Sequence, residues 1–126
     1  MDIEEVAHKT PERVISILKE YEADARPKVY ITVAGRSNAL SGFTDGSVSA
    51  PVIACPPPSE SFGGTDVYSS LRMPSGIAPA VVLDPFNAAL LAAKIFGLTN
   101  VEVREQVKAS QKRAAEKIIE DDASVR

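Results

Sequence analysis

Three short runs of apolar residues, rich in valine and isoleucine, stand out along an otherwise mixed chain. They lie at Lys28–Val33, Pro51–Ala54 and Ala80–Leu83. Runs that are apolar on both faces and only a few residues long are typical of buried strands in a parallel sheet. We therefore predict parallel strands at these runs, and a further short strand at Ile3–Ala7.

Longer segments between and after these runs place apolar residues at helical spacing. The first, Thr10–Arg26, has threonine at the N-cap position with proline directly after it, and Asp84–Phe96 repeats this arrangement with aspartate. Thr99 and Glu102 have the spacing of a capping box. This pair predicts a last helix that runs to about Glu120 and is followed by a frayed tail.

Two shorter segments are less regular. Thr65–Arg72 is predicted to form a short helix whose apolar side chains Val67, Tyr68 and Leu71 face inward. Gly42–Ser49 is polar and contains two glycines, so it is predicted to be turn-rich after a weak helical patch.

The composition fits one small domain that spans residues 1–126. The chain has 14 lysine and arginine residues against 17 aspartate and glutamate residues, and its net charge of -3 disfavours nucleic acid as a partner. No apolar run approaches the length of about 20 residues that crosses a bilayer. The single cysteine, Cys55, excludes an internal disulfide. We therefore expect a cytoplasmic protein with neither a nucleic-acid nor a membrane partner.

Candidate chemistry gathers where the predicted strands end. The first strand runs into Gly35 and small polar residues, and the second runs into Cys55–Pro58. Ligands of open α/β sheets bind just past such strand ends, although a glycine there also serves an ordinary turn. The carboxylates Asp45, Asp66 and Asp84 show no metal-ligand spacing, so no metal site is expected.

Four stretches occur in a characteristic order, at Ala7–Pro11, Ala34–Leu40, Met73–Ile77 and Asn87–Ala93. Together they resemble the phosphoribosylaminoimidazole carboxylase family of purine biosynthesis, and the similarity covers essentially all of residues 6–119. Cys55–Pro57 and the Ala-Gly-Arg-Ser-Asn loop resemble the branch that uses free carbon dioxide more than the bacterial mutase branch.

The resemblance implies a three-layer α/β/α, flavodoxin-like parallel sheet and a homo-octamer whose sites combine loops from neighbouring subunits. It implies no cofactor. Members of the family begin with an additional strand, a Gly-Ser-x-Ser-Asp phosphate loop and a helix before the Ala-His motif. The present sequence opens at about the family's second strand, so we expect a fold that is N-terminally truncated relative to the family.

The implied reaction joins carbon dioxide to the ring carbon of aminoimidazole ribonucleotide, after which a base removes the ring proton. His8 is the only histidine, and an imidazole side chain suits proton transfer near neutrality. The alternative is a surface histidine near a helix start. Lys9 is expected to pair with the new carboxylate, or else to be an ordinary solvated lysine.

The remaining site residues are expected on two loops. Backbone N–H groups there can stabilise charge that develops on the oxygens of carbon dioxide. The alternative is two ordinary turns, and Arg36 is expected either to contact ribose or phosphate or to form a salt bridge with a neighbour. The substrate-binding residues implied by the resemblance are Lys9, Gly35, Arg36, Ser37, Asn38, Ser75 and Gly76.

Three hypotheses for the function follow. The first is carboxylation of aminoimidazole ribonucleotide by carbon dioxide. The second is the mutase reaction, in which the carboxyl group arrives on the exocyclic nitrogen of the substrate. The third is a noncatalytic, shortened paralogue that serves as an assembly subunit.

Overall fold

The computed structural model describes residues 6–126, and it describes side chains from His8 onward. Helices dominate the chain, and the strands are short. The elements in chain order are α1 (Val6–Lys9), α2 (Pro11–Ala23), β1 (Tyr30–Thr32), α3 (Leu40–Ser47), β2 (Val52–Ala54), the 3₁₀ segment η1 (Ser61–Val67), α4 (Tyr68–Leu71), β3 (Ala80–Val81), α5 (Pro85–Phe96) and α6 (Val101–Val125).

The three strands form a parallel sheet in the order β1-β2-β3. Tyr30 pairs with Val52 at the start of the register, and Ala54 pairs with Val81 at its end. The three predicted apolar runs therefore become strands, each shorter than its run, and the α/β class is confirmed. The strand expected at Ile3–Ala7 is wrong for its last two residues, which belong to α1, and its first three lie outside the described residues.

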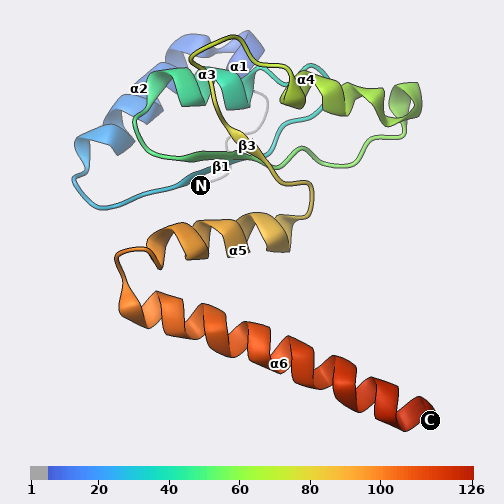
Figure 1. The fold of residues 1–126 in the computed structure, drawn as a ribbon. Helices are drawn as coiled ribbons and strands as arrows, with labels where there is room; N and C mark the ends of the chain where they lie inside the picture. Colours follow the sequence, from blue (N-terminus) through green and yellow to red (C-terminus); the bar gives the residue numbers. More distant parts are fainter. Residues whose placement is uncertain (1–5) are drawn as a thin grey trace. The chain divides into compact units, whose positions relative to one another are not determined.

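Helices α2 and α3 lie together on one side of the strands (Figure 1). Val14 and Leu18 on α2 form the buried centre of this layer, at 1% and 5% exposure. Side chains from β1, α3 and the segment after α3 pack against that centre, and these are Tyr30, Leu40, Phe43 and Val48. The helical spacing of the apolar positions in α2 thus places its inner face on the sheet.

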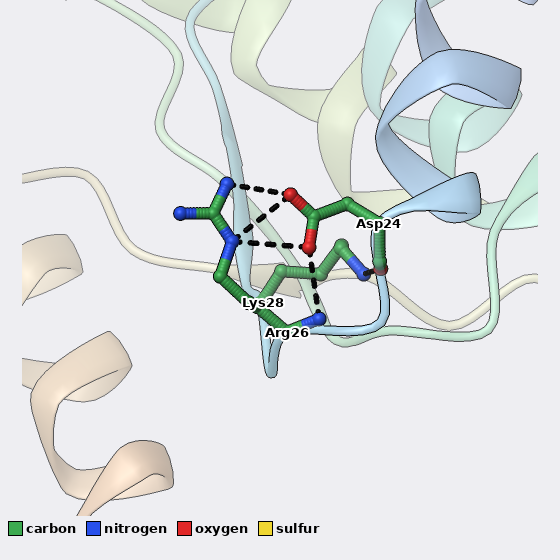
Figure 2. Close-up of polar contacts among 3 residues, drawn as sticks. All are labelled: Asp24, Arg26 and Lys28. Carbon is green, nitrogen blue, oxygen red and sulfur yellow. Dashed lines mark hydrogen bonds and ion pairs between the residues drawn. The ribbon is translucent and has the colours of Figure 1, made fainter.

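Helix α2 begins where the sequence predicts and ends earlier. Thr10 is its N-cap residue, and the Thr10 carbonyl accepts hydrogen bonds from two amides of the first turn. The helix ends at Ala23 rather than at Arg26, because the Asp24 carboxylate accepts hydrogen bonds from the Arg26 backbone N–H and guanidinium (Figure 2). These bonds lower the pKa of Asp24 to about 2, and Lys28 Nζ donates a 2.6 Å bond to the Asp24 carbonyl.

Helix α3 contradicts the prediction of a turn-rich segment at Gly42–Ser49. Its two glycines face the loop that follows α4. A Cβ atom at Gly42 would lie 3.0 Å from Met73 Sδ, and one at Gly46 would lie 3.0 Å from Ile77 Cδ1. The glycines therefore allow close packing, and the stability that the helix gains from this packing outweighs their poor helix propensity.

The segment predicted as a helix at Thr65–Arg72 is helical, but its orientation differs from the expectation. Tyr68 and Leu71 are 59% and 53% exposed, whereas Ser70 is 1% exposed. The inner face of α4 is polar because Ser70 and its neighbour Ser69 bond to the loop after β1.

Compact packing divides the chain into two units, one that ends at Ala88 and one formed by Ala89–Arg126. The expectation of a single domain over residues 1–126 stays a prediction. In the second unit, α6 is capped by Asn100, whose Oδ1 accepts a 3.1 Å hydrogen bond from Val103 N, and the predicted Thr99 cap is wrong. Helix α6 also continues to Val125, through the tail that was expected to fray.

Candidate functional site

The loops that follow the three strands meet at one edge of the sheet, because all three strands run in the same direction. They border an open pocket of about 520 Å³. A fourth segment, which includes Asp66, completes its wall. The lining residues are Gly35, Pro56, Pro57, Pro58, Ser59, Gly64, Asp66, Val67, Leu83, Asp84 and Pro85.

The loop after β1 carries four of the predicted site residues. Gly35 lines the pocket, and the ring of Pro57 lies 3.4 Å from where a Gly35 Cβ would stand. Arg36 and Ser37 are exposed, and Arg36 has a left-handed backbone with φ of 56°. Beside the pocket, this loop therefore presents the exposed side chains of Arg36 and Ser37 and the backbone of Gly35, which no side chain covers.

Asn38, in the same loop, is only 7% exposed. Its Nδ2 donates a 2.8 Å hydrogen bond to Ser70 Oγ, and its Oδ1 accepts a 3.2 Å bond from Ser41 N. These contacts join the loop to α4 and to the first turn of α3. Asn38 thus shapes the loop from within, and its predicted contact with substrate stays a prediction.

The second predicted loop, Met73–Ile77, lies against α3. Ile77 N donates to Pro74 O at 3.2 Å, and Gly76 has a φ of 90° that favours glycine at this turn position. Asp45 Oδ2 on α3 accepts a 2.7 Å bond from Ala78 N just after the turn. Ser75 and Gly76 are exposed and are not among the residues that line the pocket.

His8 and Lys9 lie in the last turn of α1, and both are exposed. Helix α1 packs against α2 and α3 and therefore lies on the same side of the sheet as these helices. Neither residue lines the pocket. Of the eight predicted site residues, only Gly35 is part of the pocket wall itself, and the roles of the eight stay predictions.

The residues that sequence reasoning missed lie on the segment that faces this loop. Asp66 Oδ2 accepts a 3.1 Å bond from Arg36 N, and Ser69 Oγ donates a 2.7 Å bond to Arg36 O. A signal for them was present in the sequence. Asp66, Ser69 and Ser70 are spaced i, i+3 and i+4, which places three polar side chains on one helical face.

The carboxylates that showed no metal spacing are used within the fold. Asp45, Asp66 and Asp84 accept hydrogen bonds from the backbone N–H groups of Ala78, Arg36 and Asn87, respectively. Within residues 6–126, no three histidine, cysteine or acidic side chains form a group that could hold a metal ion.

Cys55 directly follows β2 and is buried at 2% exposure, with its Sγ 3.7 Å from the Leu83 carbonyl oxygen. Burial, followed by the nearby charge of Asp84, raises the pKa of the Cys55 thiol. Because the thiolate is the reactive form, these surroundings favour a structural cysteine.

In the described part of the chain, no helix combines the length and the apolar composition needed to span a bilayer. The model of the family described as AIR carboxylase matches residues 5–117, which is most of the chain. The chain belongs to the AIR carboxylase family.

Named relatives agree with this membership. The chain is 65% identical over 120 residues to a phosphoribosylaminoimidazole carboxylase of Treponema denticola, covering 95% of this chain and 76% of the relative. It is 55% identical over 120 residues to the enzyme of the same name from Archaeoglobus fulgidus, covering 95% of this chain and 66% of that relative.

A bifunctional phosphoribosylaminoimidazole carboxylase/phosphoribosylaminoimidazole succinocarboxamide synthetase of Rattus norvegicus is 47% identical over 105 residues, which are 83% of this chain and 25% of the rat protein. The chain thus spans a quarter of this longer relative and about two thirds of the archaeal one.

A solved structure has the same fold. The crystal structure of Treponema denticola PurE matches with a TM-score of 0.94 at 65% identity, covering 95% of this chain and 76% of that one. The family and the α/β fold predicted from the sequence motifs are therefore confirmed.

Proposed function

We propose that this chain carboxylates 5-aminoimidazole ribonucleotide with carbon dioxide to give carboxyaminoimidazole ribonucleotide in purine biosynthesis. The observation that carries the proposal is the pocket at the carboxyl ends of the strands, in a chain whose family relatives are named phosphoribosylaminoimidazole carboxylases. As the resemblance implies, the reaction needs no cofactor and takes place in a homo-octamer; from the single cysteine and the residue spacing we place it in the cytoplasm and without a metal.

The reaction needs a nucleophilic ring carbon, an acceptor for developing charge and a base. The ring carbon forms a bond to the carbon of carbon dioxide, and the electron pair of one C=O bond moves to oxygen. The C–H bond of the same ring carbon then breaks, and its proton passes to the base. In the proposal His8 is this base, because an imidazole accepts a proton near neutral pH.

The other predicted residues bind the substrate in this proposal. Lys9 pairs with the carboxylate, while the backbones of the Gly35–Asn38 loop and of Ser75 and Gly76 supply N–H groups to the oxygens. Arg36 is exposed beside the pocket, where its guanidinium suits a ribose or phosphate group. Because His8 and the second loop do not line the pocket, substrate must extend from the pocket toward α1 or a neighbouring subunit must contribute.

The choice of free carbon dioxide over the N-carboxylated substrate of the mutase reaction rests on the resemblance of Cys55–Pro57 and the Ala-Gly-Arg-Ser-Asn loop to the branch that uses carbon dioxide. Pro56, Pro57 and Pro58 line the pocket wall in succession, and proline has no backbone N–H. This stretch of the wall therefore offers water no backbone N–H donors, and an apolar gas needs a dry space rather than hydrogen-bond partners.

The test is turnover of aminoimidazole ribonucleotide by the 126-residue chain, followed by ultraviolet absorbance at saturating bicarbonate. His8→Gln and His8→Ala should abolish turnover without changing the oligomeric state, because each removes the base from an exposed position. Glu12→Gln, another exposed change close to α1, is the matched control and should retain turnover.

Three results would contradict the proposal. Turnover that persists in both His8 variants would exclude His8 as the base. Turnover only of the N-carboxylated nucleotide would favour the mutase reaction, whereas a folded chain that turns over neither substrate and joins a full-length relative would favour an assembly subunit.

A further inference from the structure

Arg36 adopts a backbone conformation that its side chain disfavours. Its φ of 56° lies in the left-handed region, where a residue other than glycine is uncommon. The residue stands between Gly35, which lines the pocket, and Asn38, which is buried. The direction of the Gly35–Asn38 loop at the pocket therefore depends on whatever holds Arg36 in this conformation.

The side chains of Asp66 and Ser69 form hydrogen bonds with the backbone N–H and the carbonyl group of Arg36. Asp66 Oδ2 accepts a 3.1 Å hydrogen bond from Arg36 N, and Ser69 Oγ lies 2.7 Å from Arg36 O. Ser69 Oγ also accepts a 3.0 Å bond from Asn38 N. The single hydroxyl proton of Ser69 is shared between the carbonyl oxygens of Arg36 and Asp66, the second of which is 2.8 Å away.

Asp66 connects these hydrogen bonds to the Arg36 backbone, which we call the Arg36 clamp, with the pocket. It lines the pocket together with Val67 and Gly64, and it lies in η1, which leads directly into α4. An ionised carboxylate forms stronger hydrogen bonds than a neutral acceptor does. The bond to Arg36 N is therefore strong enough to offset the cost of a left-handed arginine.

We propose that Asp66, assisted by Ser69, is a positioning residue that fixes the left-handed conformation of Arg36 and so directs the Gly35–Asn38 loop toward the bound substrate. The kinetic part of this inference rests on the proposed carboxylation. The structural part concerns the loop alone and can be tested without any substrate.

The structural test is amide hydrogen exchange at Arg36 in the whole chain. Asp66→Ala should increase the exchange rate of the Arg36 amide by roughly tenfold or more, because its acceptor is lost. Asp66→Asn keeps an oxygen acceptor at the same place but a neutral and weaker one, so it should restore part of the protection. Asp45→Ala is the matched control, since that carboxylate accepts a hydrogen bond from the Ala78 amide in a different loop. It should leave the exchange rate of the Arg36 amide unchanged.

The kinetic test compares Asp66→Ala in two backgrounds. With Arg36 present, the change should raise KM for aminoimidazole ribonucleotide by about tenfold, which is the effect expected from losing one hydrogen bond that orients the loop. The fall in kcat should be smaller. With Arg36→Gly, the same change should cost much less, because glycine adopts a positive φ without strain. Asp66→Asn should raise KM less than Asp66→Ala does, because it keeps a neutral oxygen acceptor.

The outcomes separate this inference from the proposed function. Unchanged exchange at Arg36 in Asp66→Ala would overturn the positioning role whatever the activity. An equal rise in KM in both backgrounds would overturn it as well, because Asp66 would then act on the substrate directly. Loss of protection at Arg36 in a chain without carboxylase activity would support the Arg36 clamp and contradict the carboxylation.

Discussion

The phenol of Tyr30 on β1 donates a 2.8 Å hydrogen bond to Glu22 Oε1 on the last turn of α2. The second oxygen, Oε2, accepts bonds from the Ser49 backbone N–H and hydroxyl at 3.3 and 3.2 Å, just after α3. One carboxylate thereby joins α2, β1 and the segment that leads into β2. The bond from Tyr30, followed by that from the Ser49 amide, lowers the pKa of Glu22.

We expect Tyr30→Phe to lower the free energy of unfolding by about 1 kcal/mol at neutral pH, because it removes one hydrogen bond to a carboxylate. A carboxyl group with a lowered folded-state pKa stabilises the protein fully above its ordinary pKa of 4.5 and loses this contribution as the pH falls through the folded value. The difference between the two chains should therefore shrink below that pH, as urea unfolding at several pH values would measure.

Tyr21→Phe is the matched control for this change. The Tyr21 ring lies 6.3 Å from the Tyr30 ring, so the variant removes a hydroxyl from the same aromatic pair without touching Glu22. Tyr21→Phe should lower the free energy of unfolding much less than Tyr30→Phe does. A Tyr30→Phe penalty that stays constant from neutral pH to pH values well below 4.5 would show that Glu22 is not responsible.

Helix α3 should tolerate alanine at Gly42 better than valine. A Cβ atom there would lie 3.0 Å from Met73 Sδ, and the flexible methionine can move aside while alanine improves helix propensity. Valine adds two methyl groups with restricted rotamers. We expect Gly42→Val to destabilise the protein by about 1–3 kcal/mol relative to Gly42→Ala, as measured by thermal unfolding. Equal stability of the two variants would exclude close packing as the reason for glycine.

Helix α6 offers a direct comparison of two adjacent candidate caps. Asn100→Ala should destabilise the start of the helix by about 1 kcal/mol, because Val103 N loses its side-chain acceptor. Thr99→Ala should change almost nothing at that amide. Hydrogen exchange of the Val103 amide would measure both effects. Faster exchange in Thr99→Ala than in Asn100→Ala would instead support the capping box predicted from Thr99 and Glu102.

Predictions from the sequence succeeded where the signal is local. The β-branched runs marked the positions of all three strands, but only β2 is buried along its whole length, as the expectation of buried strands required, whereas Ile31 on β1 is 43% exposed and β3 is also partly exposed. Asp84 before Pro85 marked the start of α5, and Asp84 Oδ1 does accept a bond from Asn87 N at 3.0 Å. In such cases the partner lies within one turn, so the spacing alone carries the information.

Predictions failed where the partner is distant in the chain. Apolar Tyr68 and Leu71 were expected to face inward, yet the inner face of α4 is polar because Asn38 lies opposite, 32 residues before Ser70. Gly42 was read as a turn residue because nothing in its neighbourhood reveals the approach of Met73. Hydrophobicity and propensity describe a residue by itself, whereas these outcomes depend on what covers it.

The sequence by itself determined the family, the α/β class and the strands that position the pocket, because motifs, apolar runs and caps are properties of neighbouring residues. Only the tertiary structure decided that α3 is a helix, that the inner face of α4 is polar and that Asp66 holds Arg36. The physical reason is the same in each case: burial and hydrogen bonding between segments about 30 residues apart outweigh the local preferences of the residues involved.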